Sequence, residues 1–348
     1  MRNALSRTMT LLVVGVVLAA CSSNNGATPT GSGQKVQLRL GYFPNLTHAS
    51  AIVGVDNGIF QKDLGPNVTL KTSTFTAGPE EVTALFAGSL DAAYMGPNPA
   101  INAYIKSNGQ AIRIISGATS GGAFLVVKPS ITSAADLKGK RLAAPQLGNT
   151  QDVALRNWLK SKGFTTTTAG GGDVKIIDQD NATTLQTFKA GQIDGAWVPE
   201  PWASRLVIEG GAKVLVDEST LWPGGKYVTT QLVVRTEYLH AHPDVVESLL
   251  KGQVEANDFL NNNKAQAEQT VGDGIKKITG KSLPAGVLDA AWKNLTFTND
   301  PVASSLKINA DASLALGFIK SSDLANIYDL SLLNKVLTAA GKQAISTA

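Results

Sequence analysis

Two stretches of the chain repeat one order of strands and helices, and this repeat constrains the fold more than any other feature. Each copy reads strand, turn, helix, strand, helix, strand. The predicted elements are 35–42, 49–61, 68–75, 79–87 and 90–95 in the first copy, and 141–144, 151–162, 174–178, 182–190 and 193–198 in the second. The octets at the third strands also align, Ala87–Tyr94 (AGSLDAAY) with Ala190–Trp197 (AGQIDGAW). We expect an α/β protein with two similar βαβ lobes.

The ends of these strands predict where a ligand binds. Strands that alternate with helices form mainly parallel sheets, and ligands bind beyond the carboxyl ends of such strands. Here those ends read GYFPNLTH, TFTAGPEE, MGPNPA, SGATSGG, PQLGNTQD and VPEPW. Any one of them could be only a turn, but six at corresponding strand ends predict a ligand cleft between the lobes. The candidate ligand-binding residues are Tyr42, Asn45, His48, Gly78, Gly96, Asn98, Ser120, Gly121, Gly122, Gln146, Gly148, Asn149, Thr150, Gln151, Trp197, Glu200 and Trp222.

Two of these turns suit an anion. Gly148–Gln151 offers backbone N–H groups, a hydroxyl and carboxamides at a predicted helix start, which favours a negative group. Ser120–Gly122 adds a hydroxyl and allows close backbone approach. Neither turn has a basic side chain, so neutral donors would hold the anion and release it again. The equal alternative is that Thr150 and Ser120 are only a helix cap and a turn residue.

Each of the other candidate ligand-binding residues has two possible interpretations. Five aromatic residues lie at or near the same strand ends and could enclose an organic group: Tyr42, Phe43, Tyr94, Trp197 and Trp222. Core packing is the alternative for each of them. Glu200, between two prolines, could accept a hydrogen bond from a ligand amine or brace a contact between the lobes.

The residues for catalysis or metal binding do not form a recognisable motif. The chain has 348 residues with one cysteine and three histidines, and no Walker, His-Glu-x-x-His or calcium-loop motif. The context of Ser120 misses the Gly-x-Ser-x-Gly elbow by one position. We therefore expect a binding protein, not an enzyme, without cofactor or metal. The net charge is +4 without a basic cluster, which argues against a nucleic-acid partner.

The first residues predict export. Arg2 and Arg7 precede the apolar run Leu11–Ala20, which has the length of a signal-peptide core and about half that of a membrane-spanning helix. The residues LAAC ending at Cys21 resemble the lipobox of bacterial lipoproteins, which implies cleavage before Cys21 and its acylation. The alternative is an ordinary signal peptide with a chance cysteine. We expect a signal peptide over 1–20 and a lipidated flexible tether over 21–35.

Seven longer runs carry a family resemblance. They are GYFPNLTHA, FTAGPEEVTAL, LDAAYMGPNPAI, SGATSGGAFLVV, DLKGKRLAAPQLGNTQDVALRNWL, GQIDGAWVPEPWASRL and LWPGGKYVTTQLVV. They resemble the periplasmic solute-binding proteins of ABC importers, and most the branch for aliphatic sulfonates, taurine and nitrate, which includes thiamine-precursor binders. The resemblance covers about Val36 to Leu260; beyond it we expect a helical C-terminal region.

The resemblance implies the periplasmic binding protein-like II fold. Lobe 1 would comprise 36–127 plus 229–348 and lobe 2 would comprise 128–228, with Phe124–Val127 and Thr229–Val234 as crossing strands. The partners implied are a small anionic ligand, an ABC permease with its ATPase, and the membrane through the N-terminal lipid. The protein would be a monomer outside the cytoplasmic membrane.

The function expected is capture of a small organic anion by lobe closure, for delivery to an importer. An aliphatic sulfonate or taurine would place its SO₃⁻ on Gly148–Gln151 and Ser120–Gly122, with its alkyl part near Tyr42 and Trp197. Nitrate, bicarbonate or a thiamine precursor (a pyrimidine) is the alternative on the same fold. Two further alternatives are an extracytoplasmic enzyme and a sensory domain that docks to a membrane kinase.

Overall fold

The computed structural model describes residues 35–347. The predicted signal peptide, nearly all of the predicted tether and the lipidation site Cys21 lie outside these residues. Within the described range, no helix combines the length and the apolar character needed to cross a membrane.

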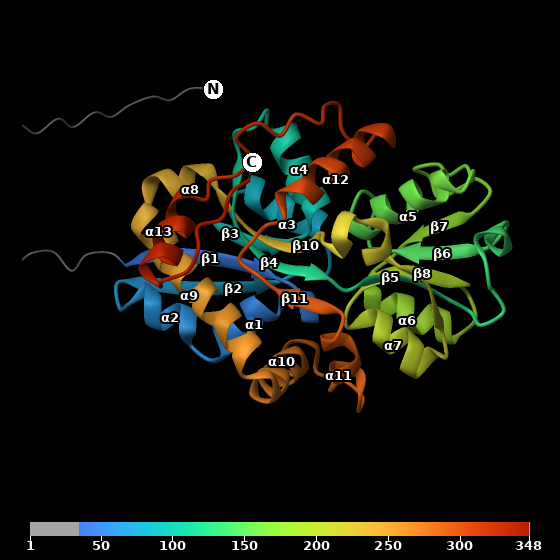
Figure 1. The fold of residues 1–348 in the computed structure, drawn as a ribbon, viewed down its shortest axis with the longest axis horizontal. Coiled ribbons are helices and arrows are strands. Elements are labelled where there is room, and N and C mark those ends of the chain that lie inside the picture. Colours follow the sequence, from blue (N-terminus) through green and yellow to red (C-terminus); the bar gives the residue numbers. More distant parts are fainter. Residues whose placement is uncertain (1–34, 348) are drawn as a thin grey trace, which may run out of the picture. The chain divides into compact units, whose positions relative to one another are not determined.

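Two mixed β-sheets organise the described chain (Figure 1). The six-stranded sheet runs, in order, β11 (Leu295–Phe297), β4 (Ile112–Gly121), β10 (Val228–Arg235), β3 (Ala92–Met95), β1 (Val36–Tyr42) and β2 (Val68–Thr74). The five-stranded sheet runs β7 (Lys175–Asp178), β6 (Arg141–Ala144), β8 (Gly195–Pro199), β5 (Ala123–Val127) and β9 (Lys213–Asp217). We call each sheet with the helices packed on it the first lobe and the second lobe.

Helices cover both faces of each sheet (Figure 1). In the first lobe one face carries α1 (Ala49–Asp56), α2 (Ile59–Leu64), α8 (Thr236–Ala241), α9 (Pro243–Asn262), α10 (Lys264–Thr279), α11 (Val287–Trp292) and α13 (Ser331–Ala339). The other face carries α3 (Gly78–Phe86), α4 (Pro97–Lys106) and α12 (Ala303–Ala315). In the second lobe α5 (Thr150–Ser161) faces α6 (Asn181–Lys189) and α7 (Trp202–Gly210) across the sheet.

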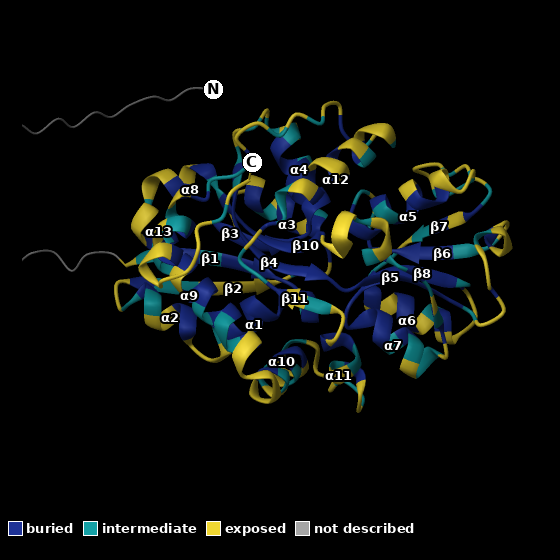
Figure 2. Ribbon diagram, viewed as in Figure 1, coloured by how far each residue is buried: buried dark blue, intermediate teal, exposed yellow. Residues whose placement is uncertain are grey.

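Alternating strand residues explain these layers. In β1, Leu38 and Leu40 point into the core under α9, while in β3 Ala93 and Met95 point into the opposite core under α4. Because successive side chains of a strand face opposite sides, apolar residues on both faces require a covered sheet. The central strands are accordingly buried, while the edge strands β2, β7 and β9 and the outer helix faces are partly exposed (Figure 2).

The predicted strands and helices of both repeats are present, with one difference. The helix expected over 49–61 is two helices, α1 and α2, separated at Asn57 and Gly58. Gly58 has a φ of 69°, in the left-handed region that ends a helix and favours glycine. The expected α/β class with two lobes and a helical C-terminal region is confirmed.

The chain passes between the sheets twice. The first passage is at Gly122, between β4 and β5, and the second lies within 218–227, between β9 and β10. The strand β5, placed in lobe 1 by the expected boundary, therefore pairs in the second sheet. The expected crossing strands Phe124–Val127 and Thr229–Val234 each lie within a single sheet, because the passages occupy the short segments beside them.

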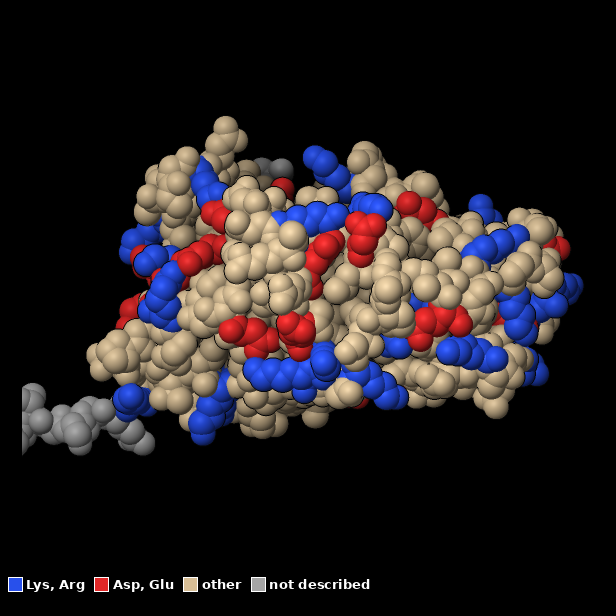
Figure 3. Space-filling view, turned by 90° about the horizontal axis from the view of Figure 1, so that it is seen from below, with Lys and Arg blue, Asp and Glu red and all other residues tan. Residues whose placement is uncertain are grey.

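Charged side chains show no large patch of one sign on the face that Figure 3 displays. Lysine and arginine side chains lie among acidic ones there. In the described chain several lysines are ion-paired, as Lys62 is with Glu255 and Lys277 with Asp56. The displayed face has no basic stripe of the kind that nucleic-acid-binding proteins present.

Candidate functional site

Turns of both lobes meet around a small buried cavity. It encloses about 20 Å³, roughly the room of one water-sized group. From the first lobe the lining residues are Phe43, Asn45, Thr47, His48, Thr76, Gly96, Thr229 and Thr230; from the second they are Pro145, Asn149, Thr150, Gln151, Asn181 and Pro199. We call this the inner cavity.

Four helices begin at the inner cavity. His48 precedes α1, Gly96 precedes α4, Asn149 precedes α5, and Asn181 is the first residue of α6. The first N–H groups of a helix have no partner within the helix, and this end carries a partial positive charge. Four such ends around one cavity create an environment that favours a negative group.

Buried hydroxyl and amide groups of the inner cavity lack partners. Within residues 35–347, Thr150 Oγ1, Asn181 Oδ1 and Thr230 Oγ1 are buried without a hydrogen bond. Their residues are exposed by only 4%, 6% and 1% respectively. Because buried polar groups are nearly always hydrogen-bonded, three unpartnered ones on one cavity point to a ligand-binding site.

His48 is neutral in this site. Burial lowers the pKa of its imidazole from 6.5 to about 3. Its Nδ1 accepts the Phe43 backbone N–H at 3.2 Å, and its ring stacks on the Phe43 ring at 4.3 Å between centroids. With Nδ1 as an acceptor, the ring proton lies on Nε2, which is a hydrogen-bond donor. No lysine or arginine is among the lining residues, so neutral donors would bind an anion here.

The two lobes touch at the cavity and at its rim. Trp202 of the second lobe donates its Nε1–H to Asn45 Oδ1 of the first lobe at 2.7 Å. Gln146 Nε2 donates to Glu80 Oε1 at 2.5 Å. A Cβ on Gly96 would lie 2.3 Å from Thr150 Oγ1, so only glycine allows this close approach. The structure therefore has the lobes closed on each other.

Six of the candidate ligand-binding residues predicted from the sequence line the inner cavity. They are Asn45, His48, Gly96, Asn149, Thr150 and Gln151. Gly78 packs beside it against Pro99, and Gln146 lies at the rim. Asn98 instead donates its Nδ2–H to Ser313 Oγ of α12 at 2.9 Å.

Gly148 shapes the helix start without lining the cavity. Its N–H donates to Asp152 Oδ2 at 2.8 Å, and Asp152 Oδ1 accepts from Arg156 Nε at 2.6 Å. Burial raises the pKa of Asp152 to about 6, against the opposing effect of the Arg156 guanidinium. This N–H is therefore engaged by the protein, and Thr150 and Gln151 provide the N–H groups that remain at the start of α5.

Most of the predicted aromatic residues lie elsewhere. Tyr42 packs in the core of the first lobe. Trp197 is fully buried in the core of the second lobe and donates its Nε1–H to Glu218 Oε2 at 2.6 Å. Trp222 stacks on Tyr227 at 5.3 Å and shares Glu218 as its acceptor. Core packing, the alternative reading, describes Tyr42 and Trp197 in this structure.

Ser120, Gly121, Gly122 and Glu200 belong to the first passage between lobes. Gly121 O accepts from Thr229 Oγ1 at 2.5 Å, and Gly122 O accepts the Glu200 N–H at 2.8 Å. The Glu200 carboxylate accepts from Ser204 and from Asn294 Nδ2 at 2.8 Å. Since Asn294 adjoins β11 of the first lobe, Glu200 joins the lobes beside the passage.

Phe43, one of the aromatic residues expected to enclose an organic group, lines the inner cavity. Sequence reasoning did not single out seven other lining residues. Four lie in the turns quoted as strand ends, and three lie outside them: Thr47, Thr76, Pro145 and Pro199, then Asn181, Thr229 and Thr230. The signal for Asn181 is its position after β7, where Asp180 caps α6 by accepting the Thr183 N–H. The signal for Thr229 and Thr230 is a pair of adjacent hydroxyls at the start of β10.

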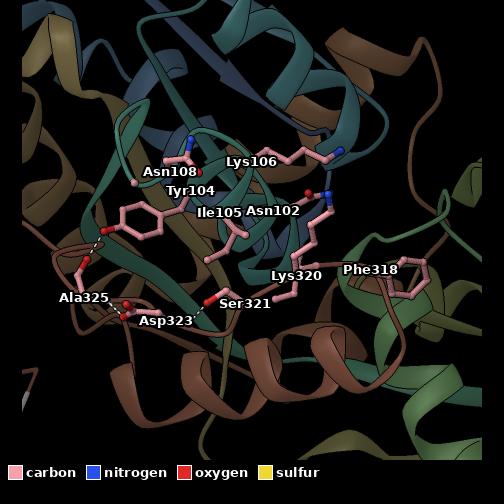
Figure 4. Close-up of a pocket in the computed structure, with 12 residues that line it drawn as sticks. Asn102, Tyr104, Ile105, Lys106, Asn108, Phe318, Lys320, Ser321, Asp323 and Ala325 are labelled. Atoms are coloured by element: carbon pink, nitrogen blue, oxygen red, sulfur yellow. Dashed lines mark hydrogen bonds between the residues drawn. The ribbon is translucent and has the colours of Figure 1, made fainter.

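A larger cavity elsewhere does not share these features. It encloses about 590 Å³ between the end of α4 and the segment after α12, and Tyr104, Lys106 and Lys320 line it (Figure 4). It lies in the first lobe alone and contains none of the predicted residues. In the described part of the chain, no group of three or more His, Cys, Asp or Glu is placed to hold a metal ion.

Comparison with solved structures identifies the class. The fold is that of the periplasmic binding proteins. The alkanesulfonate-binding protein SsuA from Xanthomonas axonopodis pv. citri, bound to MOPS, matches with a TM-score of 0.70 and 22% identity over 86% of this chain and 99% of that chain. The periplasmic nitrate-binding protein NrtA from Synechocystis PCC 6803 matches with a TM-score of 0.71 and 16% identity, over 88% and 89% respectively.

The sequence assigns the family. A model of the NMT1-like family matches residues 31–272, and the chain belongs to this family. The taurine-binding periplasmic protein of Escherichia coli (strain K12) is 27% identical over 270 residues, which are 76% of this chain and 79% of that protein. The chain is therefore a member of the NMT1-like family with the fold of the periplasmic binding proteins.

Proposed function

We propose that this chain is the extracytoplasmic substrate-binding component of an ABC importer. It captures a small organic anion, most favourably an aliphatic sulfonate or taurine, between its closing lobes and delivers it to a permease with an ATPase. Relatives that bind taurine, alkanesulfonates or nitrate support an anionic ligand. The predicted acylation of Cys21 would hold the receptor at the membrane, beside that permease.

The observation that carries the proposal is the set of unpartnered groups at the inner cavity. The hydroxyls of Thr150 and Thr230, which can donate, face a space where four helices begin. The oxygens of a sulfonate are acceptors that these hydroxyl and N–H donors can satisfy. Neutral donors form no ion pair with the anion, which keeps binding reversible for the transfer step.

Lobe closure follows from how the site is divided. Thr150, Gln151 and Asn181 belong to the second lobe, while His48 and Thr230 belong to the first. An anion that contacts both sets stabilises the closed form over any open one, because only the closed form supplies all the donors. The contacts Asn45–Trp202 and Gln146–Glu80 then close the cleft around it.

Calorimetric titration with ethanesulfonate, taurine, nitrate, bicarbonate and a thiamine-precursor pyrimidine tests this function. Thr150→Ala removes one donor from the inner cavity and should weaken binding of the best anion about five- to tenfold. Ser120→Ala is the matched control, since Ser120 lies at the passage between lobes, and it should leave affinity unchanged. Absence of saturable heat with every anion would overturn the proposal.

A further inference from the structure

The helix α12, in the C-terminal region, contacts both lobes. It packs on α4 in the first lobe and on α5 in the second, and both of these helices begin at the inner cavity. In the view of Figure 1, α12 lies between α4 and α5. The sequence predicted only helices for this region and no part in ligand binding, so its position beside both helix starts is a finding of the tertiary structure.

The last turn of α12 is fixed to the start of α4. Asn98, the second residue of α4, donates its Nδ2–H to Ser313 Oγ at 2.9 Å. The Gly317 N–H donates to Leu314 O at 3.0 Å, and the Phe318 N–H donates to Ser313 O at 2.9 Å. Gly317 has a φ of 77°, in the left-handed region that this kind of helix end requires. This turn determines the direction in which Phe318 leaves the helix.

Phe318 reaches the second lobe. The next residue, Ile319, is buried in the core of the first lobe and anchors the segment there. Figure 4 shows the Phe318 ring at the edge of the larger cavity, apart from the other labelled side chains. A Cβ on Gly148 would lie 3.8 Å from Phe318 Cδ1, so the ring lies against the turn before α5. The Arg156 guanidinium lies 6.0 Å from the ring centroid, within reach of a cation–π interaction.

The two residues that Phe318 contacts hold the start of α5. Asp152 Oδ2 accepts the Gly148 N–H at 2.8 Å, and Asp152 Oδ1 accepts from Arg156 Nε at 2.6 Å. Arg156 is only 2% exposed, and its Nη2, 3.7 Å from Asp178 Oδ1, has no hydrogen bond in the range 35–347. Because a buried cation needs compensation for its lost hydration, the aromatic face contributes to holding this arrangement.

A second contact between the lobes lies at the end of the same helix. Lys160 Nζ of α5 donates to Ala315 O of α12 at 3.2 Å. Ala315 is the last residue of α12, where a helix carries a partial negative charge that attracts cations. Lys160 is exposed and forms no ion pair within the described residues. Two contacts therefore join α5 to the end of α12 when the lobes are closed.

We propose that the end of α12, residues 313–318, is a latch that holds the lobes closed, and that Phe318 is a positioning residue for the anion site. Phe318 does not line the inner cavity, so it acts through Gly148 and Arg156. An anion that binds the closed form gains affinity from any contact that stabilises this form. This inference rests on the proposed function and adds a determinant of closure that the ligand does not touch.

Calorimetry of Phe318→Ala with taurine, ethanesulfonate and nitrate tests the latch. Because the lost contact acts on closure, affinity should fall by the same factor, about five- to tenfold, for every anion that binds. Phe318→Tyr keeps the ring and should bind within about twofold of the wild type. Phe86→Ala, at a phenylalanine 48% exposed at the end of α3, is the matched control and should bind as the wild type does. Unchanged affinity in Phe318→Ala, or losses that differ severalfold between anions, would overturn the latch.

A second variant keeps the test decisive if Phe318→Ala does not fold. Lys160→Glu places a carboxylate opposite Ala315 O without altering a packed side chain, and affinity should fall about two- to threefold. Lys162→Glu, the same charge reversal at the exposed C-cap of α5, is the matched control and should leave affinity unchanged. If Phe318→Ala does not fold, wild-type affinity in Lys160→Glu would overturn the latch.

Small-angle X-ray scattering of the ligand-free protein separates this inference from the proposed function. Without the latch the lobes should move apart, so Phe318→Ala should have a larger radius of gyration than the wild type. If no anion binds the wild type, the proposed function fails, whereas a larger radius for the variant would still support the latch. Equal radii in that case would overturn the latch as well.

Discussion

Each lobe has an aspartate at the equivalent position of its repeated octet, Asp91 in the first and Asp194 in the second, and the surroundings of the two differ. Asp91 Oδ2 accepts the Arg39 N–H at 2.9 Å, and Asp194 Oδ2 accepts the Arg141 N–H at 2.9 Å. Each aspartate thereby joins the first and third strands of its lobe. The Asp91 side chain is fully buried and paired with Arg39, whereas the Asp194 side chain is 15% exposed and paired with Lys128.

Residues of the repeated octets contribute to the packing of the two lobes, and none of them lines the inner cavity. The residues that end them, Tyr94 and Trp197, are both fully buried, with Tyr94 Oη bonded to Gln253 and Trp197 Nε1 to Glu218. Apart from Thr229 and Thr230 on β10, the cavity residues lie in or beside the turns, where the copies differ in sequence. Matching letters between two copies therefore mark shared packing, and divergent turns mark the ligand site.

The largest expected effect is on stability, where replacing Asp91 should cost more free energy of unfolding than replacing Asp194. Asp91→Ala removes a buried carboxylate beside the Arg39 guanidinium and should lower the free energy of unfolding by about 3–5 kcal/mol. Asp194→Ala should cost about 1–2 kcal/mol, because its partner ions reach water. Urea unfolding of both variants measures the difference. Equal losses would show that the two aspartates contribute equally to the free energy of unfolding.

The next largest expected effect is on the pH dependence of the free energy of unfolding, to which one buried group in each lobe contributes with opposite sign. Burial raises the pKa of Glu218, in the second lobe, from 4.5 to about 7, so the folded state retains its proton. The stability that this group contributes is present below pH 4.5 and is lost as the pH rises through 7. Between pH 5 and 8 the contribution of Glu218 to the free energy of unfolding should fall by about 2 kcal/mol. Glu218→Gln should remove this fall relative to the wild type; identical profiles for the two proteins would contradict it.

His48, in the first lobe, should act in the opposite direction. Its pKa is about 3 when folded and 6.5 as a free side chain, so the unfolded chain takes up the proton first. Its contribution is complete above pH 6.5 and is lost as the pH falls toward 3. Between pH 7 and 5 we expect the contribution of His48 to fall by about 2 kcal/mol, which nearly cancels the gain from Glu218 in the wild type. Urea unfolding of His48→Gln at the two pH values should therefore show higher stability at pH 5 than at pH 7.

The smallest expected effect concerns the contact between the lobes at the rim. Glu80→Ala removes the acceptor of Gln146, a solvent-exposed hydrogen bond. Exposed contacts of this kind contribute about 0.2–1 kcal/mol, so ligand affinity should fall no more than about fivefold. Titration with the tightest anion measures it, with Glu237→Ala on α8, remote from the cleft, as control. A loss above tenfold would make this contact a main determinant of closure.

The sequence predicted the elements and the cleft well for a physical reason. Apolar periodicity and the glycine- and proline-rich turns are local signals, and the first copy from β1 to β3 is found nearly where they placed it. The same signals located the start of α5, whose Thr150 and Gln151 line the inner cavity. Asn181 was missed because its turn is short and lacks glycine and proline.

These local signals could not predict which way an individual side chain points. Trp197 and Thr230 both lie on strands near the passage between the lobes, yet one points into a core and the other lines the inner cavity. Which face of a strand is turned to the partner lobe depends on how the two sheets are placed, and that involves residues far apart in the chain.

What the sequence by itself determined about this protein is the repeated α/β plan, the turns that line the inner cavity, and the absence of lysine and arginine at the start of α5. These follow from local periodicity, turn chemistry and residue type. Only the tertiary structure decided that Glu200 joins the lobes, that Trp197 is core, and that Asn181, Thr229 and Thr230 line the same cavity as the predicted turns. The reason is that a cavity between two lobes is defined by their packing, which no single segment encodes.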